Sequence, residues 1–326
     1  MAIYDENEKP KFAIAPMLDW TDRHCRYFHR LLTRNSLLYT EMVVADAVIH
    51  GKRECLLGFD KAEHPLALQL GGASSDKLAE AAKIGADFGY DEINLNVGCP
   101  SDRVQSGAFG ACLMLEPDLV GQIVEKMKAA VSIPVTVKCR IGVDEQNVSE
   151  ALDNLAVAVW QSGGDALWVH ARKAWLKGLS PKENRDVPPL DYQRVYELKH
   201  QNKVRYIGIN GGIKSLDEAI NHLNFVDGVM VGRYVYHNPV VLRDVDRLIY
   251  NDCHAPLDDA SLISAMSEYI DKHIENGGRL SHVTRHMTGL FLGRKGAKKW
   301  RQILSTEAND SLANSTVLKK AFSYIE

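Results

Sequence analysis

The chain has 326 residues, of which 45% are hydrophobic and 25% charged, and its formal net charge is −3. This length and apolar content allow a large buried core, leave room for one large domain and a smaller one, and exclude a largely disordered protein. A net charge this close to zero also excludes a globally basic surface, so any surface that binds nucleic acid must be local.

Neither a disulfide framework nor a local metal-binding motif is visible in the sequence. The six cysteines, at positions 25, 55, 99, 112, 139 and 253, contain no C-x-x-C pair and no His/Cys cluster. We therefore expect reduced thiols and no metal. The first eleven residues are polar, and no apolar stretch approaches the roughly 20 residues that a membrane helix needs. We expect a cytoplasmic protein that does not bind a membrane.

Eight short strand-like runs recur along the chain, and segments with helical spacing, such as 75–88 and 118–130, lie between them. The runs cover residues 12–17, 37–43, 66–70, 92–97, 135–140, 166–170, 206–210 and 228–231. This alternation predicts βα units around a buried parallel sheet, and eight units predict an α/β fold of the (β/α)8 TIM-barrel type. An open doubly wound sheet is the alternative, but it usually has fewer strands, and no G-x-G-x-x-G follows the first run.

The residues at the ends of these runs form a coherent polar set, and in a TIM barrel the active site lies at the carboxyl ends of the strands. In chain order the set contains Pro16, Met17, Leu18, Gln69, Asn96, Cys99, Lys138, Arg140, His170, Arg172, Asn210, Gly211, Gly212, Gly232 and Arg233. The glycines and the arginine of the last two ends suit a phosphate, because backbone N–H groups can approach the anion and a guanidinium adds two hydrogen bonds.

Lys138 and Gln69 indicate which phosphorylated ligand to expect. A lysine inside an apolar run points into the barrel mouth, where its ammonium is costly unless an anion or an electron-rich ring meets it. A reduced flavin carries negative charge near N1 and the C2 oxygen, and Gln69 can pair with the pyrimidine edge of the same ring. We therefore predict bound FMN. The alternatives are that Lys138 pairs with a buried carboxylate and that His170 is a core histidine satisfied by the backbone.

The fourth run ends abruptly at Gly98, Cys99 and Pro100, which places a thiol on a loop. Two glycines in the loop that follows, residues 101–110, suit a mobile lid. A free thiol has a pKa of about 8.5 and is mostly protonated at neutral pH, so Cys99 can donate a proton without an activating base. The alternative is a buried cysteine that acts as a small hydrophobic residue.

The pattern changes in the last part of the chain. From about residue 258 the apolar residues repeat at helical spacing, so we predict a barrel domain at 1–245 and a small all-helical bundle domain at 246–326. Between Arg279 and Arg301 there are seven lysines and arginines and no acidic residue. This block predicts contacts with phosphates, although a solvated face is the commoner meaning of clustered lysines.

Four motifs, in this order, resemble the tRNA-dihydrouridine synthases, specifically their bacterial A subfamily. They are APMLDWTD (15–22), NLNVGCPS (94–101), HARKAW (170–175) and GLSPKENR (178–185). The resemblance spans essentially the whole chain. It implies an oxidoreductase in which NADPH reduces FMN, the flavin passes a hydride from N5 to C6 of a uridine at position 20 or 20a in the tRNA D-loop, and Cys99 protonates C5.

The resemblance also assigns binding residues. It implies that FMN is held by Pro16, Met17, Leu18, Gln69, Lys138, His170, Asn210, Gly211, Gly212, Gly232 and Arg233. The uracil must leave the folded tRNA to lie flat on the flavin, and Asn96 and Arg172 are candidates for holding its polar edge. Contacts with tRNA are implied for Lys182, Arg185, Lys298 and Arg301. A monomer is the default expectation.

Two other functions remain open at this point. A dihydroorotate-dehydrogenase-like enzyme shares the FMN barrel and uses a loop cysteine as a base on a free pyrimidine, but it has no use for a basic helical tail. An RNA-binding or chaperone-like protein with an inactive barrel is the other alternative, and flavin absorbance in the purified protein would exclude it.

Overall fold

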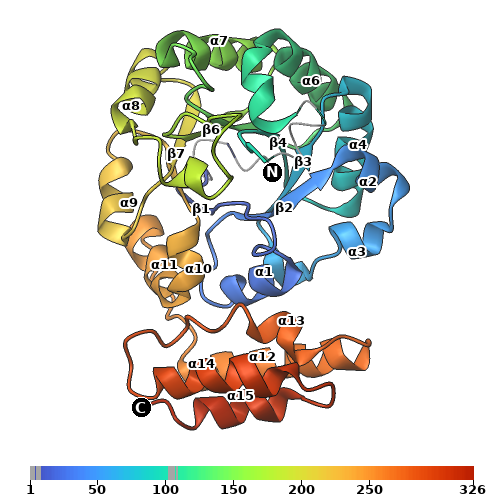
Figure 1. Cartoon of the computed structure of the whole chain (residues 1–326), viewed down its shortest axis with the longest axis vertical. Coiled ribbons are helices and arrows are strands. Elements are labelled where there is room, and N and C mark those ends of the chain that lie inside the picture. Colours follow the sequence, from blue (N-terminus) through green and yellow to red (C-terminus); the bar gives the residue numbers. More distant parts are fainter. Residues whose placement is uncertain (1–3, 5–8, 102–106, 108) are drawn as a thin grey trace.

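Eight parallel strands form the centre of the computed structural model, which describes residue 4, residues 9–101, residue 107 and residues 109–326. The strands are β1 (Phe12–Ile14), β2 (Leu38–Val44), β3 (Leu66–Gly71), β4 (Glu92–Val97), β5 (Val135–Arg140), β6 (Ala166–His170), β7 (Tyr206–Asn210) and β8 (Gly228–Val231). They pair in the order β1-β8-β7-β6-β5-β4-β3-β2. The N–H of Ile14 donates to the carbonyl of Leu37 at 2.9 Å, which joins the two edges. The predicted barrel is confirmed (Figure 1).

Strands β4 to β8 begin and end where the sequence pattern predicts, whereas β1 stops three residues early. The chain turns after β1, because the carbonyl of Met17 accepts hydrogen bonds from the N–H groups of Trp20 and Thr21 at 3.1 and 2.9 Å. Pro16 has no N–H with which to extend the ladder. The end of β1 therefore presents a turn rather than a strand to the barrel mouth.

Helices surround the barrel and cover its outer face. They are α1 (Arg23–Arg30), α2 (Ala45–His50), α3 (Arg53–Leu57), α4 (Ser75–Phe88), α6 (Pro117–Ala130), α7 (Val148–Gln161), α8 (Tyr192–Gln201), α9 (Leu216–His222), α10 (Arg233–His237) and α11 (Leu242–Tyr250), with short 3-10 turns at η1 (Lys61–Glu63), η2 (Gly110–Leu115), η3 (Glu183–Arg185) and η4 (Pro239–Val241). The predicted helix 75–88 is confirmed: Ser74 caps its start, and Gly89 ends it at φ 106°.

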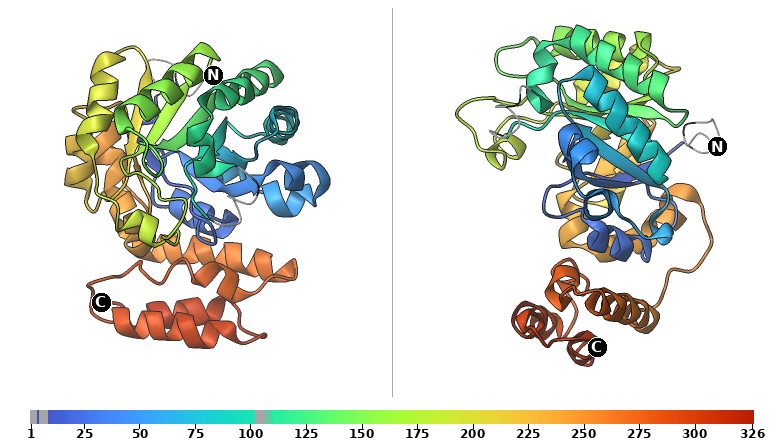
Figure 2. Two further views of the ribbon diagram at one scale, coloured as in Figure 1. Left: turned by 45° about the horizontal axis from the view of Figure 1, so that its top comes forward. Right: turned by 90° about the vertical axis from the view of Figure 1, so that its right-hand side faces the viewer.

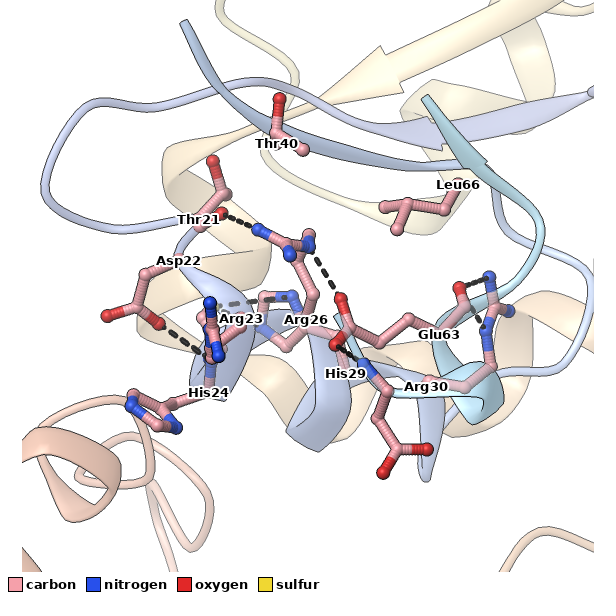
Figure 3. Close-up of polar contacts among 12 residues, drawn as sticks. Thr21, Asp22, Arg23, His24, Arg26, His29, Arg30, Thr40, Glu63 and Leu66 are labelled. Carbon is pink, nitrogen blue, oxygen red and sulfur yellow. Dashed lines mark hydrogen bonds and ion pairs between the residues drawn. The ribbon is translucent and has the colours of Figure 1, made fainter. Parts of the chain in front are cut away.

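Buried charges hold α1 against the barrel wall (Figure 3). The Nε of Arg26 donates to Oε2 of Glu63 at 2.7 Å, and both side chains are buried. The Nε of Arg30 donates to the backbone carbonyl of Glu63 at 3.2 Å. Loss of one partner of a buried ion pair leaves an uncompensated charge and costs about 3–5 kcal/mol, so these contacts fix the position of α1.

The last part of the chain, residues 259–326, is called the helical region below. It contains α12 (Asp259–Glu275), α13 (Leu280–Thr284), α14 (Ala297–Thr306), η5 (Glu307–Asn309) and α15 (Ser315–Phe322). These helices lie on one side of the barrel, at the bottom of Figure 1, and pack around their own core, in which the rings of Phe291 and Trp300 meet edge to face at 4.8 Å. The side chain of Asp258 caps α12 by accepting from the N–H of Ser261 at 2.7 Å.

The helical region contacts the barrel through α1. The rings of Tyr27 and Tyr269 stack at 4.0 Å between centroids. Asp22, which caps α1, accepts from Nη2 of Arg285 at 2.5 Å and lies 3.0 Å from Nε2 of His286. No helix in the described part of the chain is both long and apolar enough to cross a bilayer.

Candidate active site

The strand register brings the predicted residues together at one end of the barrel. Asn96 lies opposite Lys138 in the β4–β5 pair, and His170 lies opposite Asn210 in the β6–β7 pair. Gln69 in turn lies opposite Asn94. Because the carboxyl ends of parallel strands share one edge, these polar groups surround a common opening.

Cys99 lies on the loop after β4 and is partly buried. The Oδ1 atom of Asn96 accepts hydrogen bonds from the backbone N–H groups of Gly98 and Cys99 at 3.1 and 2.9 Å. A Cβ atom on Gly98 would come within 3.3 Å of the backbone of Cys139, so a glycine at this position eases the close passage of the loop by β5. The Sγ atom of Cys99 contacts Oγ of Ser101 at 3.6 Å. The backbone on either side of the thiol is therefore held in place, and the Cys99 side chain is partly buried against the edge of the hydrophobic core.

A chain of side-chain amides supports this loop from below. The Nδ2 of Asn96 donates to Oε1 of Gln69 at 2.8 Å, and the Nε2 of Gln69 donates to Oδ1 of Asn94 at 2.8 Å. Asn94 then donates to Oγ1 of Thr136 at 2.7 Å, and Thr136 donates to the buried carboxyl of Glu92. Burial raises the pKa of Glu92 to about 7 even though hydroxyl groups donate to it. Asn96 and Gln69 are thus held in fixed orientations.

Lys138 and Arg140 bring positive charge to the same opening. The ammonium of Lys138 makes no hydrogen bond or ion pair to any described residue in this structure, and burial, together with the charge of Arg140, lowers the pKa of Lys138 to about 8. Among the described residues no carboxylate pairs with it, contrary to the alternative that it pairs with a buried acid. Arg140 donates from Nε to the carbonyl of Gly98 at 3.2 Å and from Nη1 to the carbonyl of Asn184 at 2.8 Å, which ties the Cys99 loop to the loop after β6.

His170 is partly buried near the opening, and its Nδ1 atom is buried with no hydrogen-bond partner among the described residues. Burial lowers its pKa well below the ordinary value, so the ring is neutral at pH 7. Its other edge lies against Gly211, where an added Cβ would come within 3.2 Å of the ring. Gly211 and Gly212 have φ of 116° and 73°, which only glycine adopts readily. The orphaned nitrogen contradicts the alternative of a histidine satisfied by the backbone.

The ends of β1 and β8 complete the opening. A Cβ on Gly232 would come within 3.1 Å of the sulfur of Met17, so these two ends touch. Leu18 is 65% exposed, which is unusual for a leucine beside a barrel mouth. Arg233 pairs through Nη1 with Oδ1 of Asp186 at 2.8 Å. Asn210 donates to the carbonyl of Met230 at 2.7 Å and faces inward.

Arg172 lies on the loop after β6, whose following segment, drawn in yellow-green, projects beyond the barrel (Figure 2). One guanidinium nitrogen donates to the carbonyl of Pro188, and Nε has no partner among the described residues. Lys182 and Arg185 are exposed farther along the same segment. Asn184, between them, is fully buried and holds the segment by bonding the backbone of Trp175 in both directions, at 2.7 and 2.9 Å.

Only some of the lysines and arginines in the basic block of the helical region (residues 279–301) are free of ion pairs. Arg285 pairs with Asp22, Arg294 with Asp259, and Lys295 with Glu326. Among the described residues, Lys298 and Arg301 make no ion pair. Both lie on α14, three positions apart. The solvated-face interpretation therefore holds for part of the block, and the two residues expected to contact tRNA are among those left unpaired.

One sequence prediction lies mostly outside the described residues, and one feature of the site was not predicted. The lid prediction falls on residues 101–110, of which 102–106 and 108 lie outside the described residues. The support provided by Asn94, Arg140 and Asn184 was not predicted. For Asn94 a signal existed, because Glu92, Asn94 and Asn96 alternate with period two and so share the inner face of β4.

Comparison with known proteins agrees with this geometry. Residues 13–325 match the dihydrouridine synthase (Dus) family. The curated tRNA-dihydrouridine(20/20a) synthase of Shewanella oneidensis is 54% identical over 315 residues, which cover 97% of this chain and 94% of the relative. The protein of the same name from Escherichia coli (strain K12) is 54% identical over 316 residues, which cover 97% and 91%. That of Vibrio vulnificus (strain CMCP6) is 51% identical over 316 residues, which cover 97% of each.

Proposed function

The chain belongs to the dihydrouridine synthase family, and from this premise we propose that it reduces uridines 20 and 20a of tRNA to dihydrouridine, with bound FMN and with NADPH as the reductant. The names of the relatives support the substrate and the positions. The observation that best supports the proposal is the set of groups at the barrel mouth. There an uncompensated ammonium and an orphaned imidazole nitrogen lie beside a glycine-lined wall, next to a loop that carries a thiol.

The residues at the mouth fit FMN. Lys138 would meet the negative charge of the reduced ring, and His170 Nδ1 would gain the partner it lacks. At Gly211, Gly212 and Gly232 the backbone N–H groups, unshielded by side chains of their own, would be the donors to a phosphate. The bonds of Arg233 to Asp186 and to the carbonyl of Arg185 engage two of its five N–H groups, so it retains donors for that phosphate. Met17, Leu18 and Pro16 would form an apolar wall, with Gln69 and Asn210 at the ring edge. FMN, when bound here, would supply the hydride for C6 of the uracil.

Cys99 would supply the proton for C5. Its Sγ–H bond breaks as the C5–H bond forms, and the thiolate recovers a proton from water afterwards. Asn96 holds the backbone of Cys99 through Oδ1, so the thiol enters the mouth in a fixed position. Arg172, whose Nε is free, suits a uracil carbonyl oxygen, and the second N–H of Asn96 suits another.

The tRNA would be held by two surfaces. Lys182 and Arg185 lie on the exposed segment after β6, and Lys298 and Arg301 lie on α14. In this arrangement the barrel domain predicted at 1–245 binds the cofactor and contributes one tRNA-binding surface, and the helical domain predicted at 246–326 contributes the other. Since tRNA is the substrate, the enzyme would act in the cytoplasm, and one copy of the chain contributes all the residues named.

The test is to incubate the purified protein with unmodified tRNA and NADPH and to measure dihydrouridine by mass spectrometry, beside flavin absorbance and NADPH oxidation. We expect dihydrouridine at positions 20 and 20a. Cys99→Ala should lower its formation by about 10²–10⁴-fold, the usual contribution of general acid catalysis, while the yellow colour and the oxidation of NADPH persist.

The matched control is Cys55→Ala, an exposed cysteine on α3 that should leave all three measurements unchanged. Reduction of a free pyrimidine with no change in tRNA would replace this proposal with the dihydroorotate-dehydrogenase-like alternative. A colourless protein that binds tRNA without modifying it would replace it with the inactive-barrel alternative.

A further inference from the structure

Three histidines from distant parts of the chain meet where the helical region contacts the barrel. His24 is on α1, His273 is near the end of α12 and His282 is on α13. One ring nitrogen from each lies within 4.8 Å of one ring nitrogen of each of the others, and among the described residues this is the one such cluster. Figure 3 shows the His24 ring pointing away from the barrel toward the helical region.

We propose that His24, His273 and His282 form a binding site for a divalent transition-metal ion, with water in the remaining coordination position. Three imidazole nitrogens and a water are a common ligand set for tetrahedral Zn²⁺, and imidazole also suits Co²⁺, Ni²⁺ and Cu²⁺. In such a site, ligand nitrogens about 2.0–2.1 Å from the metal lie roughly 3.3 Å apart. His273 Nε2 and His282 Nδ1 are already 3.1 Å apart.

Two neighbours of the cluster fit this role, whereas the long hydrogen bond from the Arg279 N–H to His282 Nδ1, at 3.4 Å, would open when a metal ion binds that nitrogen. The Nδ1 of His24 is hydrogen-bonded to the hydroxyl of Tyr269 at 2.8 Å, which leaves Nε2 as the ligand atom. A hydrogen bond on the second nitrogen is the usual support of a metal-bound histidine. The ring of His273 lies over Gly278, where an added Cβ would come within 2.1 Å of Nε2, so a glycine at that position permits the ring to approach its neighbours.

Access and charge also suit a cation. His24 and His282 line a cavity of about 680 Å³ whose wall includes Asp22 and Ser281, so a fourth ligand can come from solvent. His24 is buried, His273 is partly buried and His282 is exposed, which gives the ion a path of entry. Two arginines lie nearby: Arg23 donates to the carbonyl of Glu54 at 2.5 Å, and Arg285, which lines the same cavity, is paired with Asp22.

An ion at this site would link α1 of the barrel to two helices of the helical region. The consequence is mechanical and does not depend on the reaction: metal binding would stabilise the contact between the two regions. The three ligands lie at positions 24, 273 and 282, so no local spacing motif indicates the site. For this reason the sequence alone led us to expect no metal.

The test uses the full-length flavoprotein without a polyhistidine tag, stripped with EDTA and titrated with ZnCl2 in a calorimeter. We expect one ion per chain and a rise in the melting temperature. His273→Ala and His282→Ala should each weaken binding at least tenfold and abolish that rise. His200→Ala, an exposed histidine on α8, should change neither.

Two further measurements keep the test decisive if a histidine variant folds poorly. Tyr269→Phe should weaken Zn²⁺ binding by about tenfold, since it removes the support of His24, whereas Tyr27→Phe, in the ring stacked on Tyr269, should not. Co²⁺ should give the d–d absorption of a tetrahedral site in the parent protein. No binding at 0.1 mM metal, or binding that His273→Ala and His282→Ala leave unchanged, would overturn the proposal.

Discussion

The barrel mouth and the basic block of the helical region both carry several positive side chains, but they differ in whether those side chains have acidic partners. At the mouth, none of the described residues gives Lys138 a carboxylate partner or His170 Nδ1 a hydrogen bond. In the basic block, Arg285, Arg294 and Lys295 are each paired with an acidic residue. Clustered charge in a sequence is therefore a weak indicator of a ligand site. Groups that folding buries without partners are a stronger one, because their cost is recovered only when a ligand binds.

The largest expected effect comes from removing the uncompensated ammonium of the mouth. Lys138→Met should weaken FMN binding by about 100-fold, since buried charged contacts with a ligand are worth about 2–5 kcal/mol. The FMN-free variant should be at least as stable as the parent at pH 7, because an unpaired charge has been removed. Flavin fluorescence titration and thermal unfolding measure the two quantities.

The pH dependence of the same variant gives a second check. The pKa of Lys138 is about 8 in the folded protein, below the usual 10.4 of the unfolded chain. Between these values the unfolded chain holds the proton that the folded protein has lost, so the stability of the FMN-free parent should rise with pH from about 8 to 10 through this group. Lys138→Met should lack that component. Lys199→Met, which removes an ammonium paired with Asp227, should instead destabilise the protein and leave FMN binding intact.

The next effect concerns the position of the thiol. Asn96→Ala removes the acceptor of the Gly98 and Cys99 N–H groups, and we expect dihydrouridine formation to fall about tenfold to 100-fold through kcat, because small misplacements of a reacting group are costly. Flavin content and the affinity for tRNA should change little. Asn96→Asp, which keeps an acceptor, should recover part of the rate. An equal loss in both variants would mean that Asn96 acts on the uracil rather than on the loop.

A smaller effect is expected where the two regions meet. Burial alone would raise the pKa of Asp22, but His286 and Arg285 more than offset this, so its pKa lies well below the ordinary value. The stability that Asp22 contributes is therefore present above about pH 4 and is lost as the pH falls further. Asp22→Asn keeps the helix cap and removes the charge. It should cost about 1–2 kcal/mol at pH 7 in urea unfolding and less at low pH. Asp76→Asn, in an exposed pair, should cost little.

The smallest effect tests which basic residues are free. Lys298→Ala and Arg301→Ala should each weaken tRNA binding severalfold and reduce the slope of log K against log salt concentration by about 1. Lys295→Ala should do less, because Glu326 already holds its ammonium at 2.5 Å. Equal effects for all three would show that the ion pair of Lys295 opens when tRNA binds. Whether a basic side chain is paired in the free protein would then not predict its contribution to tRNA binding.

The sequence predicted the barrel and which residues lie at its mouth, because both depend on local sequence pattern. Strands β4 to β8 begin and end as predicted, since alternation and turn residues are properties of neighbouring positions. The loop that carries Cys99 was predicted for the same reason, because Gly98 and Pro100 interrupt a strand wherever they occur. The place of Asn96 beside Lys138 follows from the parallel pairing of consecutive strands, β4 and β5.

Only the tertiary structure decided which of these groups have partners. The pairing of Asp22 with Arg285, the bonds of Arg140 to Gly98 and Asn184, and the meeting of His24 with His273 and His282 join residues 42 to 263 positions apart in the chain. No local period encodes such contacts. They follow from how helices and loops pack once the barrel has closed, and hydrogen bonds and ion pairs act only over the few ångströms that packing brings about.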